Sequence, residues 1–129
     1  MDKLKGYVYC GYYIDNHNIK TYKIGYTTKT PSKRQYDISM QNQATFNMIK
    51  YVTVNNTTKQ DLMFVESWLR RELSKYIEYN YTSNDHFNYI EEEHSTEYIT
   101  NICINSIVKC LHFIGHKDYV IKDKVNKRI

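Results

Sequence analysis

The sequence has few of the residues that mark extended or cross-linked proteins. One proline and four glycines among 129 residues exclude a long linker or a low-complexity segment. Cys10, Cys103 and Cys110 form an odd, unpatterned set, so we expect free thiols in a reducing compartment rather than a disulfide framework. No apolar run reaches the length of a membrane span, and MDKLKGYVYC lacks the apolar core of a signal peptide. These absences predict a cytoplasmic protein with no membrane partner.

The residues that are abundant indicate one globular domain with basic ends. The chain is 41% hydrophobic and 25% charged, with fourteen tyrosines and a net charge of +4, which is enough for a single core. Residues 1–34 carry seven Lys or Arg against two Asp, and residues 116–129 carry five against two. Residues 85–97 contain five acidic side chains and no Lys or Arg. Basic ends suit a polyanionic partner, although a solvated lysine-rich surface explains the charge equally well.

The order of predicted elements is β-β-α-β-α-β-α. Aromatic and β-branched runs predict the strands. Thr30-Pro31, Thr58 with Asp61, and Ser95 are start signals for the three helices. The predicted strands are 6–13, 20–26, 46–54 and a short one within 85–90, and the predicted helices are 31–41, 59–78 and 96–115. This order predicts an α+β fold with a small, mainly antiparallel, three-stranded sheet flanked by helices.

Two charged side chains on the predicted helices are candidates for chemistry. Glu66 lies one turn beyond Leu62 on the inner side of helix 59–78, where a carboxylate needs a cation or a metal as its partner. An i,i+4 ion pair with Arg70 is the alternative explanation. Arg34 lies one turn before Ile38, and its planar fork matches a phosphate. A plain surface position explains Arg34 as well.

The tyrosine-rich stretch 7–27 predicts a hairpin with two faces. Tyr7 and Tyr9 share one face of the first strand, while Val8 and Cys10 share the other. Tyr22, Ile24 and Tyr26 alternate with Lys23 and Gly25 on the second strand. A cross-strand aromatic cluster accounts for most of these tyrosines. A glycine inside a strand, here Gly25, indicates close approach of another backbone or of a ligand.

The joint order of these features resembles the GIY-YIG endonuclease superfamily. Tyr7-Val8-Tyr9, preceded by Gly6, stands at the first motif, and Lys23-Ile24-Gly25 stands at the second. Arg34 matches the helix arginine of the superfamily, and Glu66 in LMFVESWLRREL matches its metal-binding glutamate. The nearest likeness is to the branch of phages and large DNA viruses with a KIG second motif. The resemblance covers about residues 5–90.

The resemblance implies a metal-dependent endonuclease that hydrolyses phosphodiester bonds of DNA. Glu66 would ligate Mg²⁺ or Mn²⁺, Arg34 would hold the phosphate, and Tyr9 would act as general base. A phenol has an unperturbed pKa of roughly 10 and needs nearby cations, which Lys23 and Arg34 would supply. Tyr22, Gly25, Tyr26 and Asn88 would line the substrate site, and Lys20, Lys29 and Lys33 would contact phosphates.

The same resemblance implies the organisation of the chain and an alternative function. Residues 1–90 would form the nuclease-like domain, 91–115 a helix packed on it, and 116–129 a basic tail. The alternative is a non-catalytic nucleic-acid-binding or interaction module on the same scaffold. A specificity partner protein, or a homodimer through the last helix, is compatible with either function. A zinc set of Cys103, Cys110, His112 and His116 is disfavoured, because the cysteines suit a core helix face better.

Overall fold

A computed structural model describes residues 3–14, 20–42, 45–73, 78–79, 86–88 and 95–123. In chain order the elements are β1 (Leu4–Ile14), β2 (Lys20–Thr27), α1 (Pro31–Asn42), β3 (Asn47–Thr57), α2 (Lys59–Leu73), β4 (Glu78–Tyr79), β5 (His86–Asn88), α3 (Thr96–Phe113) and β6 (Tyr119–Asp123). The predicted α+β class is confirmed.

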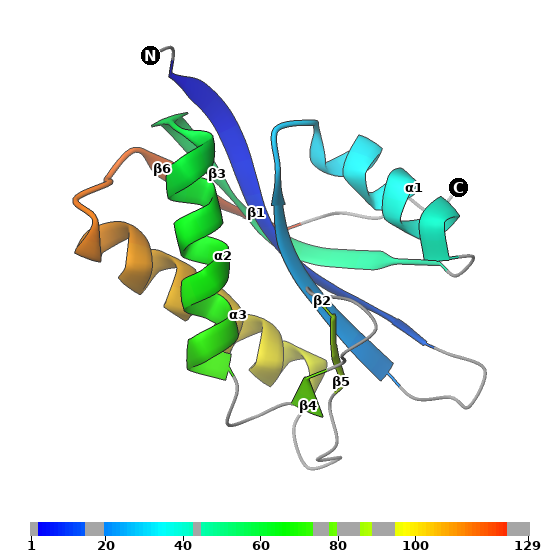
Figure 1. The fold of residues 1–129 in the computed structure, drawn as a ribbon. Coiled ribbons are helices and arrows are strands. Elements are labelled where there is room, and N and C mark those ends of the chain that lie inside the picture. The colour runs from blue at the N-terminus through cyan, green and yellow to red at the C-terminus, as the bar shows by residue number, and fades with distance from the viewer. Residues whose placement is uncertain are drawn as a thin grey trace.

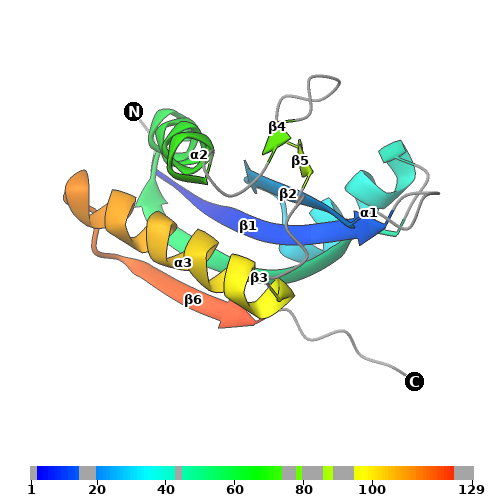
Figure 2. The same cartoon turned by 90° about the horizontal axis from the view of Figure 1, so that it is seen from below.

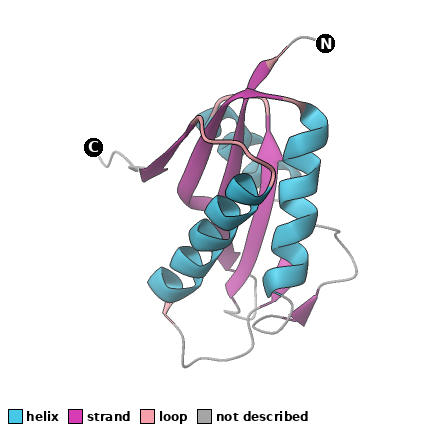
Figure 3. Ribbon diagram, turned by 90° about the vertical axis from the view of Figure 1, so that its left-hand side faces the viewer, coloured by secondary structure: helices cyan, strands magenta, loops and turns pink. Residues whose placement is uncertain are grey.

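The strands form one sheet with the order β4-β5-β2-β1-β3-β6, and all its paired neighbours run antiparallel. Helices α2 and α3 lie side by side on one face, and α1 covers the other (Figures 1 and 3). The central hairpin pairs Tyr9 with Gly25 and Gly11 with Lys23. These four residues therefore share the face that α1 covers.

Each face of the sheet has its own hydrophobic core. On the α2–α3 face, the larger core contains Val8, Cys10 and Ile24 of the hairpin together with the buried stripe of α2, which is Leu62, Val65, Leu69 and Leu73. On the α1 face, a small core contains Tyr9, Ile38, Phe46 and Met48. The predicted division of Tyr9 from Val8 and Cys10 is thus confirmed. Tyr9 is held in the smaller core, next to α1.

The predicted helix starts are confirmed by their hydrogen bonds. The Lys33 amide donates to Thr30 Oγ1 at 3.3 Å, and the Asp61 amide donates to Thr58 Oγ1 at 3.2 Å. Ser95 accepts from the Tyr98 amide at 3.1 Å. These side chains satisfy amide groups that the first turn of a helix leaves unpaired. The α1 and α2 caps matter for function because Arg34 and Glu66 follow them by one and two turns.

The structure differs from the sequence-based prediction at the edges of the sheet. Among the described residues, the sheet has six strands rather than three. Residues 119–123, expected in a basic tail, form β6 at the edge of the sheet (Figure 2) and pair with Lys50–Val54 of β3. The carboxylate of Asp118 joins the two strands, because it accepts from Asn55 Nδ2 at 3.1 Å and from Asn56 Nδ2 at 2.9 Å. Glu78, expected at the end of a helix, belongs to β4.

No helix in the described part of the chain is long and apolar enough to cross a membrane. Residues 15–19, between the first two strands, and Glu91–Glu93, in the acidic segment, lie outside the described ranges. The last helix ends at Phe113, before Gly115, whose φ of 76° is left-handed. This left-handed residue ends the helix in the manner typical of a glycine just past a C-terminus.

Candidate functional site

Tyr9 and Arg34 form the best-defined part of the candidate site. The side chain of Tyr9 is buried on the α1 face of β1, edge-on to Phe46 with ring centroids 6.1 Å apart. Arg34 Nε donates to the Tyr9 hydroxyl at 3.1 Å, and the guanidinium carbon lies 5.9 Å from the ring centroid. A cation that donates to a phenol oxygen stabilises the phenolate. The Tyr9 oxygen is thus held beside the positive charge of the Arg34 guanidinium.

Gly25 gives the Tyr9 ring its place. A Cβ on Gly25 would lie 2.5 Å from the Tyr9 hydroxyl oxygen and 2.8 Å from the carbon that carries it. Any other residue at position 25 would push the phenol out of its position, because real contacts of this kind are about 1 Å longer. The close approach expected at Gly25 is thus made by a tyrosine side chain from the neighbouring strand.

Glu66 lies on α2, over the opposite face of the sheet from Tyr9. Its side chain is 18% exposed, and Oε1 accepts from Arg70 NH2 at 2.9 Å. The alternative ion pair is therefore real. Helix α2 can approach β1 closely because Gly6 has no side chain, since a Cβ there would collide with Leu62. The close packing of α2 on β1 sets the position of Glu66 relative to the hairpin.

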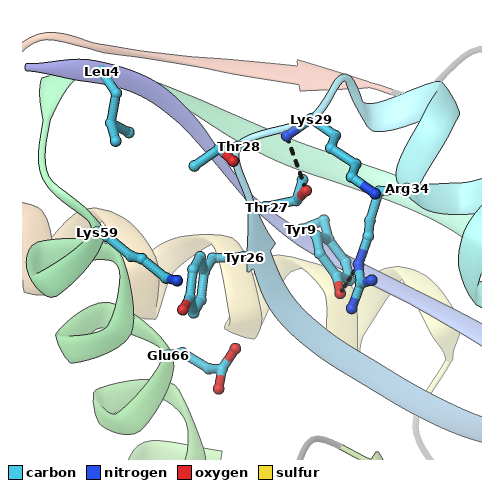
Figure 4. A pocket seen from close by; sticks show the side chains of 9 residues that line it. All are labelled: Leu4, Tyr9, Tyr26, Thr27, Thr28, Lys29, Arg34, Lys59 and Glu66. Carbon is cyan, nitrogen blue, oxygen red and sulfur yellow. Dashed lines mark hydrogen bonds between the residues drawn. The ribbon is translucent and has the colours of Figure 1, made fainter.

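The two halves of the site meet in one cavity of about 520 Å³ at the end of β2. Its lining residues are Leu4 and Tyr9 of β1, Tyr26 and Thr27 of β2, Thr28, Lys29, Arg34 of α1, and Lys59 and Glu66 of α2. Figure 4 shows Tyr9 and Arg34 on one side of the β2 ribbon, and Tyr26, Lys59 and Glu66 on the other. In the described part of the chain, β5 pairs with β2 at residues 21–23 and not at the end of β2 that lines the cavity. The cavity thus opens beside the end of the strand, where side chains from both faces can reach it.

Six of the predicted site residues are not among the cavity-lining residues: Lys20, Tyr22, Lys23, Gly25, Lys33 and Asn88. Lys23 is 4% exposed and is not among the cavity-lining residues. Tyr22 is buried in the larger core and donates to Thr96 Oγ1 at 3.2 Å. The side chains of Lys20 and Asn88 are outside what the structure describes.

The cavity is rich in positive charge, and its cations are not equivalent. Lys29 Nζ is 3.2 Å from Asp37, which also pairs with Lys33 at 3.2 Å. The hydrogen bond from Lys33, with help from Lys29, lowers the pKa of Asp37. Within the described ranges, no carboxylate pairs with Arg34 or Lys59.

Lys59 was not predicted from the sequence as a site residue. It is the first residue of α2 and precedes Glu66 by seven positions, so the two side chains project from nearly the same face of the helix. A lysine at a helix start has no distinctive sequence signal. Its seven-residue spacing from the glutamate was the one available indication.

The described residues offer a divalent cation a minimal site. Glu66 is the one carboxylate among the residues that line the cavity, and no group of three His, Cys, Asp or Glu suited to a metal occurs in the described part of the chain. Mg²⁺ is commonly held by one or two carboxylates with substrate phosphates and waters. The donor set therefore fits a cation whose coordination the substrate completes, but not an all-protein cage.

The four residues of the disfavoured zinc set have other partners or are buried in the core. His112 Nε2 is 2.8 Å from the Tyr119 hydroxyl, and His116 Nε2 is 2.8 Å from the Asn55 carbonyl oxygen. Cys103 and Cys110 are buried in the larger core. Burial raises the pKa of the Cys110 thiol to about 11, which disfavours the thiolate that zinc requires.

The fold and the cavity together define an α+β domain with a cationic site at the end of its central hairpin. The T5orf172 domain matches residues 6–115, and the chain belongs to this family, a phage-associated domain in the GIY-YIG-like, homing-endonuclease-related group. Searches of curated proteins and of solved structures gave no significant match.

Proposed function

We propose that this protein is a metal-dependent endonuclease of the GIY-YIG type that hydrolyses phosphodiester bonds of DNA. One observation carries the proposal: Tyr9, Arg34 and Glu66, from three different elements, line the same cavity. In-line attack on a phosphodiester needs a base, a cation on the phosphate and a ligand for a metal. The phenol, the guanidinium and the carboxylate in the cavity can supply them in turn. The family assignment supports a nuclease-like role.

Each of the three side chains has a distinct task in the proposed reaction. The Arg34 guanidinium binds the scissile phosphate and offsets the charge that grows on its oxygens. The Tyr9 oxygen, already an acceptor from Arg34 at 3.1 Å, would act as a phenolate and take the proton of the attacking water, becoming a neutral phenol. The water oxygen would bond to phosphorus as the P–O bond to the leaving strand end breaks, and the leaving oxygen would take a proton from solvent. Glu66 would hold Mg²⁺ or Mn²⁺, which would supply Lewis-acid stabilisation of the phosphate.

Lys23 acts in this proposal through charge rather than contact. It lies on the face that holds Tyr9, across from Gly11, and its burial keeps its field from being screened by solvent. The ion pair with Arg70, at 2.9 Å, orients the Glu66 carboxylate. This carboxylate would have to bind both Arg70 and the metal cation. We also place the reaction in the cytoplasm of a bacterial or virus-infected host cell, with a specificity partner protein or a second copy of the chain as further partners.

The alternative function is a non-catalytic DNA-binding module. The observation in its favour is the same Glu66–Arg70 pair, because a carboxylate already neutralised by arginine has less need of a metal. This module would bind DNA through the same cationic cavity, with strong dependence on salt.

A plasmid cleavage assay tests the proposal. Purified protein is incubated with supercoiled DNA and Mg²⁺ or Mn²⁺, with chelator as control, beside Arg34→Ala, Tyr9→Phe and the control Lys109→Ala, an exposed lysine of α3 outside the cavity lining. We expect metal-dependent nicking by the wild type and by Lys109→Ala, and a loss of about a hundredfold or more in the other two variants. Salt-sensitive DNA binding without cleavage under any metal condition would instead establish the alternative.

A further inference from the structure

Lys59 is a cavity residue without a role in the proposed reaction. Its side chain lines the cavity from the first turn of α2, where Thr58 caps the helix through the Asp61 amide at 3.2 Å. The capped turn fixes the backbone from which the lysine projects. No carboxylate pairs with its ammonium group in the described ranges of the chain. The lysine therefore presents an uncompensated charge to whatever enters the cavity.

Arg34 and Lys59 supply two such charges on opposite sides of β2 (Figure 4). The other cavity cation, Lys29, is already paired with Asp37. The volume of about 520 Å³ falls in the range of sites that hold a whole small molecule rather than a single anion. Two separated cations in a cavity of that size suit a ligand with two phosphates.

Tyr26 lies on the same side of β2 as Lys59 and Glu66 of α2. Figure 4 shows its ring between the Lys59 ammonium group and the Glu66 carboxylate. An aromatic face next to a phosphate-binding cation is the arrangement by which proteins hold a nucleotide's base or sugar along a strand. The α2 side of the cavity thus offers a cation, an aromatic ring and a carboxylate, and Arg34 supplies a second cation on the other side of β2.

We infer that Lys59 binds the phosphate next to the one that is cut, so that the cavity accepts a DNA strand crossing the end of β2. This inference rests on the proposed function and deepens it. It makes Lys59 a substrate-binding residue and predicts that a diester with a single phosphate lacks one of the two anchoring contacts. The preferred substrate is then an internal linkage of a polynucleotide strand.

The first test measures the salt dependence of DNA binding, without metal so that nothing is cut. Binding of fluorescein-labelled oligonucleotides is measured by anisotropy for wild type, Lys59→Ala, Lys59→Arg and Lys109→Ala, an exposed lysine of α3 away from the cavity. Loss of one phosphate contact lowers the slope of log K against log salt by about 0.9 for duplex or about 0.7 for single strands. We expect this change for Lys59→Ala alone.

The second test compares cleavage of a DNA strand with cleavage of a substrate that has a single phosphate. Cleavage of the oligonucleotide and of bis(p-nitrophenyl) phosphate, which has one phosphate, is compared for wild type and Lys59→Ala. We expect kcat/KM for DNA to fall about tenfold or more, as for a lost charged contact, with the small diester unaffected. Equal losses on both substrates would overturn the second-phosphate role, because Lys59 would then act at the scissile phosphate itself.

The outcomes distinguish this inference from the proposed function. An unchanged salt slope in Lys59→Ala, with normal binding by the wild type, overturns the Lys59 contact and leaves the nuclease proposal intact. A reduced slope without cleavage by any protein supports the contact and overturns the nuclease proposal. Absence of DNA binding by the folded wild type overturns both.

Discussion

Replacing Gly25 by alanine should disable the site through the Tyr9 side chain. The added Cβ would lie 2.5 Å from the Tyr9 hydroxyl oxygen, against about 3.5 Å for an unstrained contact. The phenol oxygen must therefore move by about 1 Å. The ring cannot turn away freely, because it is fully buried and edge-on to Phe46. The movement breaks or lengthens the 3.1 Å hydrogen bond from Arg34.

The expected magnitudes follow from these distances. Overpacking of a well-filled core costs about 1–3 kcal/mol, and about 1 kcal/mol lowers the Tm of a domain of this size by roughly 4 °C. Misplacement of a reacting group by about 1 Å reduces the rate by about a hundredfold. We therefore expect Gly25→Ala to remain folded with a Tm several degrees lower, and to lose nearly all cleavage.

Gly115→Ala is the matched control for this prediction. Gly115 has a φ of 76°, and nothing lies within 4 Å of a Cβ placed there. Alanine in the left-handed region costs about 1–2 kcal/mol, so both variants lose similar stability, but Gly115 does not line the cavity. Thermal unfolding and plasmid cleavage are measured side by side. If Gly25→Ala cuts DNA as well as Gly115→Ala does, the proposed positioning of Tyr9 by Gly25 is wrong.

Three further predictions concern the charges and thiols. Arg70→Gln frees the Glu66 carboxylate from its 2.9 Å ion pair, so half-maximal cleavage should need less Mg²⁺; a higher requirement in the titration would contradict this. The pKa of Asp37 is lowered, first by Lys33, so the ionised carboxylate stabilises the fold fully above the ordinary carboxyl pKa, and this stabilisation is lost as the pH falls through the lowered value. Asp37→Asn should therefore weaken the fall in unfolding free energy below about pH 4. An unchanged fall in this variant would exclude the effect. Burial raises the pKa of Cys110 to about 11, so its alkylation by iodoacetamide at neutral pH should follow global unfolding, and rapid labelling of the native protein would disprove its burial.

The parts of the fold with local signals were predictable from the sequence. Thr30-Pro31 and Thr58 placed the starts of α1 and α2, because capping depends on neighbouring residues. Strand β6 was missed since YVIKD is short, carries charge, and is largely exposed. Its structure depends on pairing with β3, far away in the sequence, and on Asp118. Such distant pairing leaves no local pattern.

In the candidate site, too, residues within sequence motifs were predictable, whereas those placed by distant packing were not. The motif order brought Tyr9, Arg34 and Glu66 together in prediction, and the structure places them around one cavity. Lys23 was expected beside them and shares the sheet face of Tyr9, but it lies two residues before Gly25 on β2, is buried, and does not line the cavity. Lys59 was missed because its role depends on how α2 packs over the end of β2. That packing depends on Gly6 and Leu62, which meet only in the folded chain.

The most direct test of the proposed nuclease is cleavage by a protein that lacks only the Glu66 carboxylate. Wild type, Glu66→Gln and Glu72→Gln, a second glutamate of α2 outside the cavity lining, are assayed on plasmid DNA across a range of Mg²⁺ concentrations. Loss of the stabilisation that a metal provides, several kcal/mol, should lower cleavage by Glu66→Gln about a thousandfold or more. Glu72→Gln should match the wild type. Metal-dependent cleavage that persists in Glu66→Gln would contradict the proposed site.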